Sequence, residues 1–121
     1  MSKIKILKDT EAAIAVKNFL NATLKEIMTL LRAECGSLFL FDGDNKELVL
    51  DSLYNSQSNN LVGLRQRVGE GVAGKVVDIS APVLVKDIDL DPRFSKNGHT
   101  HYHTKSFISI PLFSSLGLIG V

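Results

Sequence analysis

The sequence predicts an α+β domain, a mainly antiparallel sheet with helices on its faces, and three observations indicate it. The 121 residues leave room for one domain with one hydrophobic core. Apolar residues make up 45% of the chain and charged residues 22%, which is typical of a globular rather than a disordered protein. The expected elements run helix, hairpin, short helix, strand, loop and hairpin, an order that does not repeat as strand–helix–strand.

A long amphipathic helix is expected first, from about Asp9 to Ala33, after a linker of residues 1–8. Asp9 and Thr10 are candidate N-cap residues, because their side-chain oxygens can accept from the free amides of the first turn. Apolar residues recur every three or four positions and so share one helix face: Val16, Leu20, Leu24, Ile27 and Leu31. The stripe is wider than one sheet face requires, and we therefore expect part of this helix to pack on another helix.

A hairpin should follow the helix. The apolar run Ser37–Phe41 and the partly alternating run Glu47–Tyr54 flank the turn residues Asp42–Lys46. Further on we expect a short strand at Leu64–Val68, a short helix at Val72–Asp78 and a strand at Pro82–Lys86. After an irregular stretch from Asp87 to Gly98, a last hairpin should pair Ser106–Phe113 with Leu118–Val121, whose outer edge we expect to lack a pairing strand.

The glycines Gly69, Gly71 and Gly74 have the GxGxxG spacing of a dinucleotide-binding turn, and Asp87 stands at the end of the next strand. The helix after them is short, however, the whole unit is smaller than a normal βαβ unit, and no second mononucleotide half follows. The pattern therefore favours a tight strand-to-helix turn. A small nucleotide-dependent enzyme that uses this turn is the alternative.

The other groups of chemically active residues give only weak evidence for a functional site. His99, His101 and His103 alternate, and in an extended segment they could converge on a metal ion, yet they lie in a predicted polar loop. Their plainer interpretation is a solvated loop, so we assign no metal site, name no cofactor and identify no catalytic residue. Cys35 is the only cysteine, which excludes a disulfide within the chain and cysteine-ligated zinc or iron–sulfur sites.

The charge balance argues against two classes of partner. Fourteen basic residues face 13 acidic ones, so no strong field would attract nucleic acid or anionic lipid. No apolar stretch approaches the length of a membrane span, and the N-terminus does not resemble a secretory signal. We expect a cytoplasmic protein.

Taken together, the segments resemble a GAF domain, a sensory and regulatory domain of signal-transduction proteins. The match runs in family order along nearly the whole chain, in four stretches: Ala33–Asp42, Val68–Val77, Pro82–Phe94 and Thr104–Val121. The glycine-rich turn into a short helix is the family's own pattern. The resemblance implies a central antiparallel sheet with the long helix on one face and a roof of short helices and loops over a pocket on the other.

In function, the resemblance implies a non-catalytic module that senses a small molecule or dimerises, and that relays its state to an output domain of a larger protein. A homodimer through the N-terminal helix is expected. The chain ends where the family continues into a closing helix, so we expect a truncated domain over residues 9–121. Cyclic-nucleotide-binding relatives carry an Asn-Lys-Phe-Asp-Glu set that we cannot assemble here. Bilin-binding relatives have a cysteine in the roof, and relatives that reduce free methionine sulfoxide use several cysteines.

The pocket residues are proposed from strand alternation and from the roof. Side chains alternate along a strand. If Ser37, Phe39 and Phe41 in the first strand face the roof, Leu38 and Leu40 face the helix. The candidate ligand-binding residues are Ser37, Phe39, Phe41, Val72, Val76, Asp87, Phe94, Tyr102 and Thr104. Each of these also has a plain interpretation as a core or loop residue.

Overall fold

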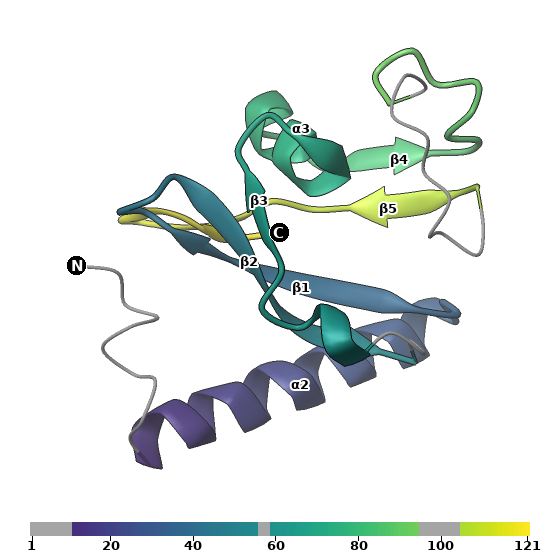
Figure 1. Ribbon diagram of the computed structural model, residues 1–121. Coiled ribbons are helices and arrows are strands. Elements are labelled where there is room, and N and C mark those ends of the chain that lie inside the picture. Colours follow the sequence, from purple (N-terminus) through teal and green to yellow (C-terminus); the bar gives the residue numbers. More distant parts are fainter. Residues whose placement is uncertain (1–10, 56–58, 95–104) are drawn as a thin grey trace.

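The computed structural model describes residues 11–55, 59–94 and 105–121 (Figure 1). Two α-helices lie in these ranges, α2 (Glu11–Leu31) and α3 (Gly71–Ile79), together with a short 3₁₀ helix, η1 (Asn59–Leu61). The described strands are β1 (Gly36–Asp42), β2 (Glu47–Tyr54), β3 (Arg65–Arg67), β4 (Val83–Val85), β5 (Phe107–Ser109), β6 (Leu112–Ser114) and β7 (Gly117–Gly120). Most of the expected elements are therefore present, whereas the expected N-cap residues Asp9 and Thr10 lie outside the described residues.

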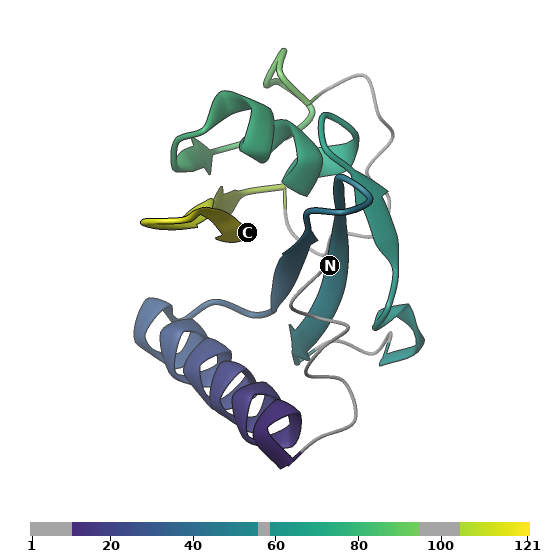
Figure 2. The same cartoon turned by 90° about the vertical axis from the view of Figure 1, so that its left-hand side faces the viewer.

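All described strand pairs are antiparallel, and they form two sheets. The larger sheet has the order β3-β2-β1-β7-β6, and the smaller one pairs β4 with β5. Figure 2 shows α2 on one side of the large sheet and α3 with the small sheet on the other. The predicted α+β fold, with a helix on one face and a roof over the other, is confirmed.

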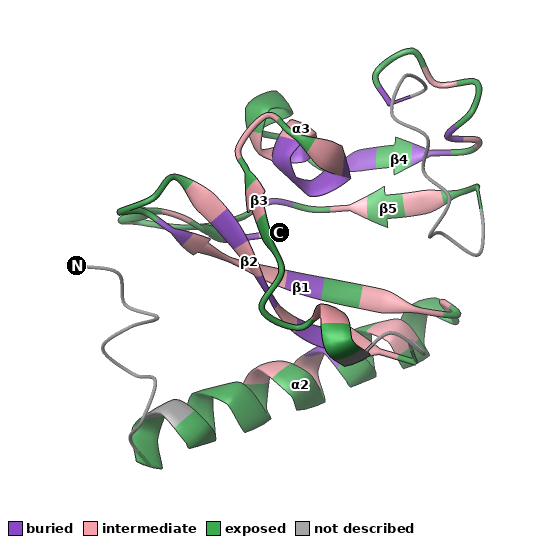
Figure 3. Ribbon diagram, in the orientation of Figure 1, coloured by how far each residue is buried: buried purple, intermediate pink, exposed green. Residues whose placement is uncertain are grey.

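The face that α2 turns toward the sheet is narrower than its apolar stripe. Leu24 is buried, and Leu20 and Met28, one turn away on either side, are half-buried. Three members of the predicted stripe, Val16, Ile27 and Leu31, are exposed instead. The helix contacts the sheet along a row of every fourth residue, so the rest of its apolar surface remains uncovered by the described part of the chain (Figure 3).

The last apolar arm does not form one continuous strand. It divides into β5, which pairs with β4, and β6, which pairs with β7. Pro111 lies between the two and is buried; because proline has no amide hydrogen, it interrupts a strand ladder.

The prediction that Leu118–Val121 forms an unpaired edge of the sheet is wrong. Strand β7 lies between β1 and β6, and Phe39 and Val121 exchange two backbone hydrogen bonds of 2.8 and 2.9 Å. The edge strand on this side of the sheet is β6.

A buried carboxylate fixes the turn of the β1–β2 hairpin. Asp42 is 2% exposed and accepts hydrogen bonds from the backbone amides of Asp44 (3.1 Å) and Asn45 (3.4 Å). Its other oxygen accepts from the Asn45 side chain and from Arg65 in β3, each at 2.9 Å. The hydrogen bond from Arg65, followed by that from Asn45, holds the pKa of Asp42 well below its ordinary value of 3.8.

We expect Asp42→Asn to lower the urea midpoint at pH 7 and to remove part of the acid sensitivity of folding. A carboxylate whose pKa is depressed by folding stabilises the protein above its unfolded pKa, near 3.8, and this stability is lost as pH falls toward the folded pKa. The gap between wild type and variant should therefore narrow as pH falls from 5 toward 2. Glu70→Gln, at an exposed residue without a side-chain capping bond, is the control. A gap that stays constant over this pH range would contradict the assignment.

Candidate functional site

The pairing of β1, β2 and β3 determines which side chains face α3. Phe41 in β1 lies opposite Leu48 in β2, and Leu48 lies opposite Gln66 in β3. Residues directly opposite one another share a face of the sheet. The Gln66 side chain lies against Gly71 in the first turn of α3, where it would meet any Cβ added to that glycine. Phe41 therefore faces α3.

The other odd-numbered residues of β1 share this face. Phe39 lies opposite Leu50 and is half-buried, whereas Ser37 is exposed near the beginning of the strand. The even-numbered side faces the long helix, because a Cβ on Gly36 would meet the Met28 side chain of α2. The structure thus brings Phe39 and Phe41 to the roof side, while Ser37 lies toward the end of that face.

The roof has a hydrophobic core of its own. Its buried members come from α3, from β4 and from the segment after β4: Val72, Val76, Val83, Val85, Ile88 and Phe94. Phe107 and Val121 are partly buried and pack against this cluster. Phe94 has no exposed surface, and its ring meets that of Phe107 edge-on, with centroids 5.5 Å apart and planes at 73°. Three of the expected pocket residues, Val72, Val76 and Phe94, are therefore core residues of the roof.

The acidic residues after β4 shape their own loop. Asp87 is half-buried, and its carboxylate accepts a 3.0 Å hydrogen bond from the Asp89 amide. Asp91 accepts from the backbone and from the guanidinium of Arg93, and this hydrogen bonding lowers the pKa of Asp91. Lys105 forms an ion pair of 2.8 Å with Asp89. In the described segment these carboxylates act as turn residues, with local partners.

The glycine motif forms a tight turn between antiparallel elements. Gly71 has a φ of +66°, which favours glycine, and a Cβ on Gly74 would run into the backbone carbonyl of Arg67. β3 pairs with β2 and β4 with β5, in both cases antiparallel. The dinucleotide fold instead requires parallel strands around the crossover helix. The geometry therefore supports the strand-to-helix turn over the nucleotide interpretation.

Several predicted site residues cannot be placed. Tyr102 and Thr104, together with His99, His101 and His103, lie outside the described residues. Conversely, the structure places Gln66 and Phe107 beside the predicted site, and the sequence pattern did not single them out. The pairing of β3 with β2 reveals Gln66, but three residues are too few for alternation to be recognised in a sequence.

The architecture defines a class of small module, in which a five-stranded antiparallel sheet carries a long helix on one face and a roof with a second, small sheet on the other. No described helix is both long and apolar enough to cross a membrane. The sequence profile of the GAF domain matches residues 16–121. The chain therefore belongs to the GAF domain family.

Two curated relatives, a regulatory protein and a phosphodiesterase, are much longer than this chain. The Nif-specific regulatory protein of Herbaspirillum seropedicae is 28% identical over 109 residues, which cover 84% of this chain and 20% of that protein. The dual 3',5'-cyclic-AMP and -GMP phosphodiesterase 11 of Drosophila melanogaster is 29% identical over 132 residues. This match covers 96% of this chain and 9% of the phosphodiesterase. The chain thus spans a fifth or less of the length of these relatives.

Solved structures share the fold. The GAF domain from a phosphoenolpyruvate-protein phosphotransferase of Coxiella burnetii superposes with a TM-score of 0.75 at 24% identity, covering 96% of this chain and 68% of that one. Free methionine-R-sulfoxide reductase from Neisseria meningitidis, solved with its substrate, gives a TM-score of 0.65 at 26% identity. The superposition covers 96% of this chain and 64% of the reductase chain. The same fold therefore occurs as one domain of a phosphotransferase and in a reductase.

Proposed function

We propose that this chain is a non-catalytic regulatory module of a cytoplasmic signalling protein, which senses a small molecule or dimerises and relays its state to an output domain. One observation carries the proposal: the chain matches 20% of a regulatory protein and 9% of a phosphodiesterase, which is the footprint of one module in a larger protein. Function in this family depends on the site rather than on the fold.

The site favours regulation over catalysis. The reductase with the same fold is the enzymatic precedent, and the resemblance implies several cysteines for that activity. This chain has Cys35 alone. The carboxylates Asp42, Asp87 and Asp91 are occupied by bonds that shape their own turns. A nucleotide-dependent enzyme is the second candidate, and the antiparallel setting of the glycine turn weighs against it.

The proposed ligand site lies between the large sheet and the roof. Phe39 and Phe41 form its floor, and α3 with the segment after β4 forms its cover. Asp87 and Phe94 belong to that cover, and Ser37, Val72, Val76, Tyr102 and Thr104 stay in the proposal as candidate residues. A ligand that binds one arrangement of roof and sheet better than another would shift the population between them.

Hydrogen exchange tests the sensing role. The amides of Ile88, Leu90 and Phe94 donate to backbone carbonyls within or beside the roof. A ligand from a metabolite library should slow their exchange, because it stabilises the closed arrangement of the roof. Amides of α2 provide the internal control. The proposal of a sensor fails if the ligand-free protein is already fully protected at these amides and no compound changes their exchange.

The uncovered side of α2 supports self-association as the second part of the proposal. Val16, Phe19, Ile27 and Leu30 fall on one side of the helix, next to the row that faces the sheet. Phe19 is 67% exposed and Leu30 is 78% exposed. We propose that a second copy of the chain covers this side, since two such helices would bury the same apolar strip against each other.

The double variant Phe19→Glu/Leu30→Glu should raise the dissociation constant of the dimer on the order of a hundredfold or more, because two charges would be buried in the interface. Asn18→Glu/Asn21→Glu adds the same charge to exposed positions on another side of α2 and should leave association unchanged. Light scattering across a concentration series measures both. A wild-type chain that remains monomeric at high concentration would refute dimerisation through α2.

A further inference from the structure

The central strand of the large sheet is incompletely covered on the roof side. β1 lies in the middle of the strand order, where an inward-facing side chain is normally fully buried. Yet Phe39 and Phe41 are only half-buried. On the same face, in the neighbouring strand β2, Leu48 is 0% and Leu50 is 3% exposed. On this face, the aromatic side chains of β1 are therefore less covered than the leucines of β2 beside them.

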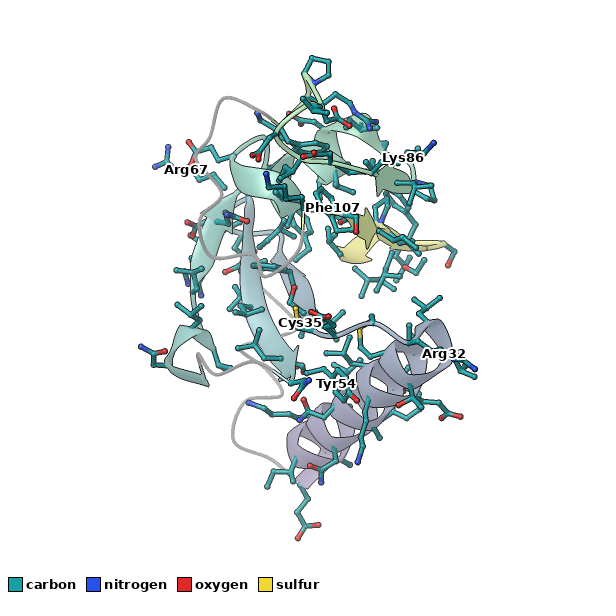
Figure 4. The ribbon with its side chains drawn as sticks, turned by 90° about the vertical axis from the view of Figure 1, so that its right-hand side faces the viewer. Arg32, Cys35, Tyr54, Arg67, Lys86 and Phe107 are labelled. Atoms are coloured by element: carbon teal, nitrogen blue, oxygen red, sulfur yellow. The ribbon has the colours of Figure 1, made fainter. Side chains whose placement is uncertain are left out.

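The buried core of the roof is separate from the buried leucines of β2. Its core cluster joins α3, β4 and the segment up to Phe94, and it includes none of the buried leucines of β2. Phe107 and Val121 lie at the boundary of this cluster and are only half-buried. Figure 4 shows Phe107 below α3, on the side of the large sheet. Val121 is hydrogen-bonded to Phe39 and Phe107 lies on the sheet side of the roof, so we take these two apolar side chains to border the site.

One uncommitted polar group lies on this face. Gln66 is half-buried beside Gly71, and its side-chain amide makes no hydrogen bond to any described residue. Two cations of the roof have partners elsewhere: the Lys75 ammonium donates to the Arg93 carbonyl at 3.0 Å, and Arg93 pairs with Asp91. Lys86 directly follows buried Val85 and is exposed, so it lies on the outer side of β4. The described side chains that face this site, Phe39, Phe41 and Gln66, therefore offer carbon and one neutral amide.

From this juxtaposition we propose that the ligand of the roofed site is an uncharged small molecule with an apolar ring or chain and one group that hydrogen-bonds to Gln66. This inference rests on the sensing role proposed above and names its ligand class. A neutral apolar body loses little on leaving water and gains contact with Phe39, Phe41 and Phe107. An ion in the same place would lose its hydration without a paired countercharge.

Benzamide and benzoate form a matched pair of probes, since they share a ring and a planar head group and differ in charge. Titrations of the ¹⁵N-labelled chain at pH 7 should show benzamide shifting the backbone amides of Phe39 and Phe41 and the side-chain amide of Gln66. Benzoate should bind about tenfold more weakly or worse. Cyclic GMP, which carries a phosphate, serves as a larger anionic probe and should also bind weakly.

Gln66→Leu keeps the size of the side chain and removes its amide, so it should weaken benzamide binding about fivefold to tenfold. Arg67→Leu is the matched control in the next position of β3. Arg67 is exposed and points outward from the sheet edge (Figure 4), so this change should leave benzamide affinity as in the wild type. Retained spectral dispersion in both variants verifies that they fold.

Three outcomes overturn the inference. If benzoate or cyclic GMP binds more tightly than benzamide at these residues, the site is anionic in preference, while the sensing role stands. If benzamide shifts only the amides of α2, or binds the Gln66→Leu variant equally well, Gln66 does not orient the ligand. If no compound, neutral or charged, perturbs the roof, the sensing role itself fails, and this inference fails with it.

Discussion

Replacing Gly120 with alanine is expected to lower the free energy of unfolding by about 3 kcal/mol, because the new methyl group has no room. Gly120 is buried in β7 and lies opposite Leu40 in β1. A Cβ at this position would collide with the Phe39 carbonyl oxygen and crowd the Leu40 Cα. Both obstacles are backbone atoms, so relief requires separating β7 from the central strand and stretching the Phe39–Val121 hydrogen bonds.

Urea denaturation of Gly120→Ala beside Gly43→Ala measures this effect. Gly43 lies in the β1–β2 turn, and its added Cβ would reach only a ring carbon of Phe41 at an ordinary 3.6 Å. The control should remain within about 0.5 kcal/mol of the wild type. Equal midpoints for the two variants would mean that β1 and β7 do not approach as closely as the structure places them.

Local sequence signals were sufficient for the elements near β1. The alternation in Glu47–Tyr54 and the turn residues Asp42–Lys46 predict a hairpin, and β1 and β2 pair as expected. The glycine-rich turn also predicts the start of α3 within one residue, since few other residues tolerate the backbone that Gly71 adopts. These features depend on neighbours in sequence, which is why pattern reasoning recovers them.

Features that depend on distant contacts were harder to predict. The periodicity of α2 cannot distinguish apolar residues that meet the sheet from those that remain uncovered, so it does not separate the exposed Ile27 and Leu31 from the buried Leu24. The apolar pattern of Ser106–Phe113 predicts one strand through Pro111, although Pro111 separates β5 from β6. The place of β7 inside the sheet is set by its long-range pairing with β1, and no local pattern encodes that pairing.

The candidate site was predicted in part. Alternation along β1 is enough to group Phe39 with Phe41, but their common face is identified only through Gln66 and its contact with Gly71. Phe94 carries the same aromatic signal in the sequence whether it lines a site or fills a core. Its complete burial, which only packing determines, is what assigns it to the core of the roof.

Phe94→Ala should therefore act on stability first and lower the free energy of unfolding by about 3–4 kcal/mol, the usual cost of removing a fully buried ring. Leu90→Ala, four residues earlier and 80% exposed, is the control and should change stability by less than about 0.5 kcal/mol. Both values come from urea denaturation of the whole chain. A Phe94→Ala variant as stable as the wild type would contradict the packing of the roof.

A double-mutant cycle with Phe107→Ala separates the ring contact from burial in general. The edge-on geometry of the two rings predicts a coupling of about 0.5–1.5 kcal/mol beyond the sum of the single losses. Phe107 also borders the proposed ligand site, whereas Phe94 lies wholly inside the roof. Phe107→Ala should therefore weaken benzamide binding even under conditions where the protein remains folded. If the two changes add without coupling, the two rings do not pack as described.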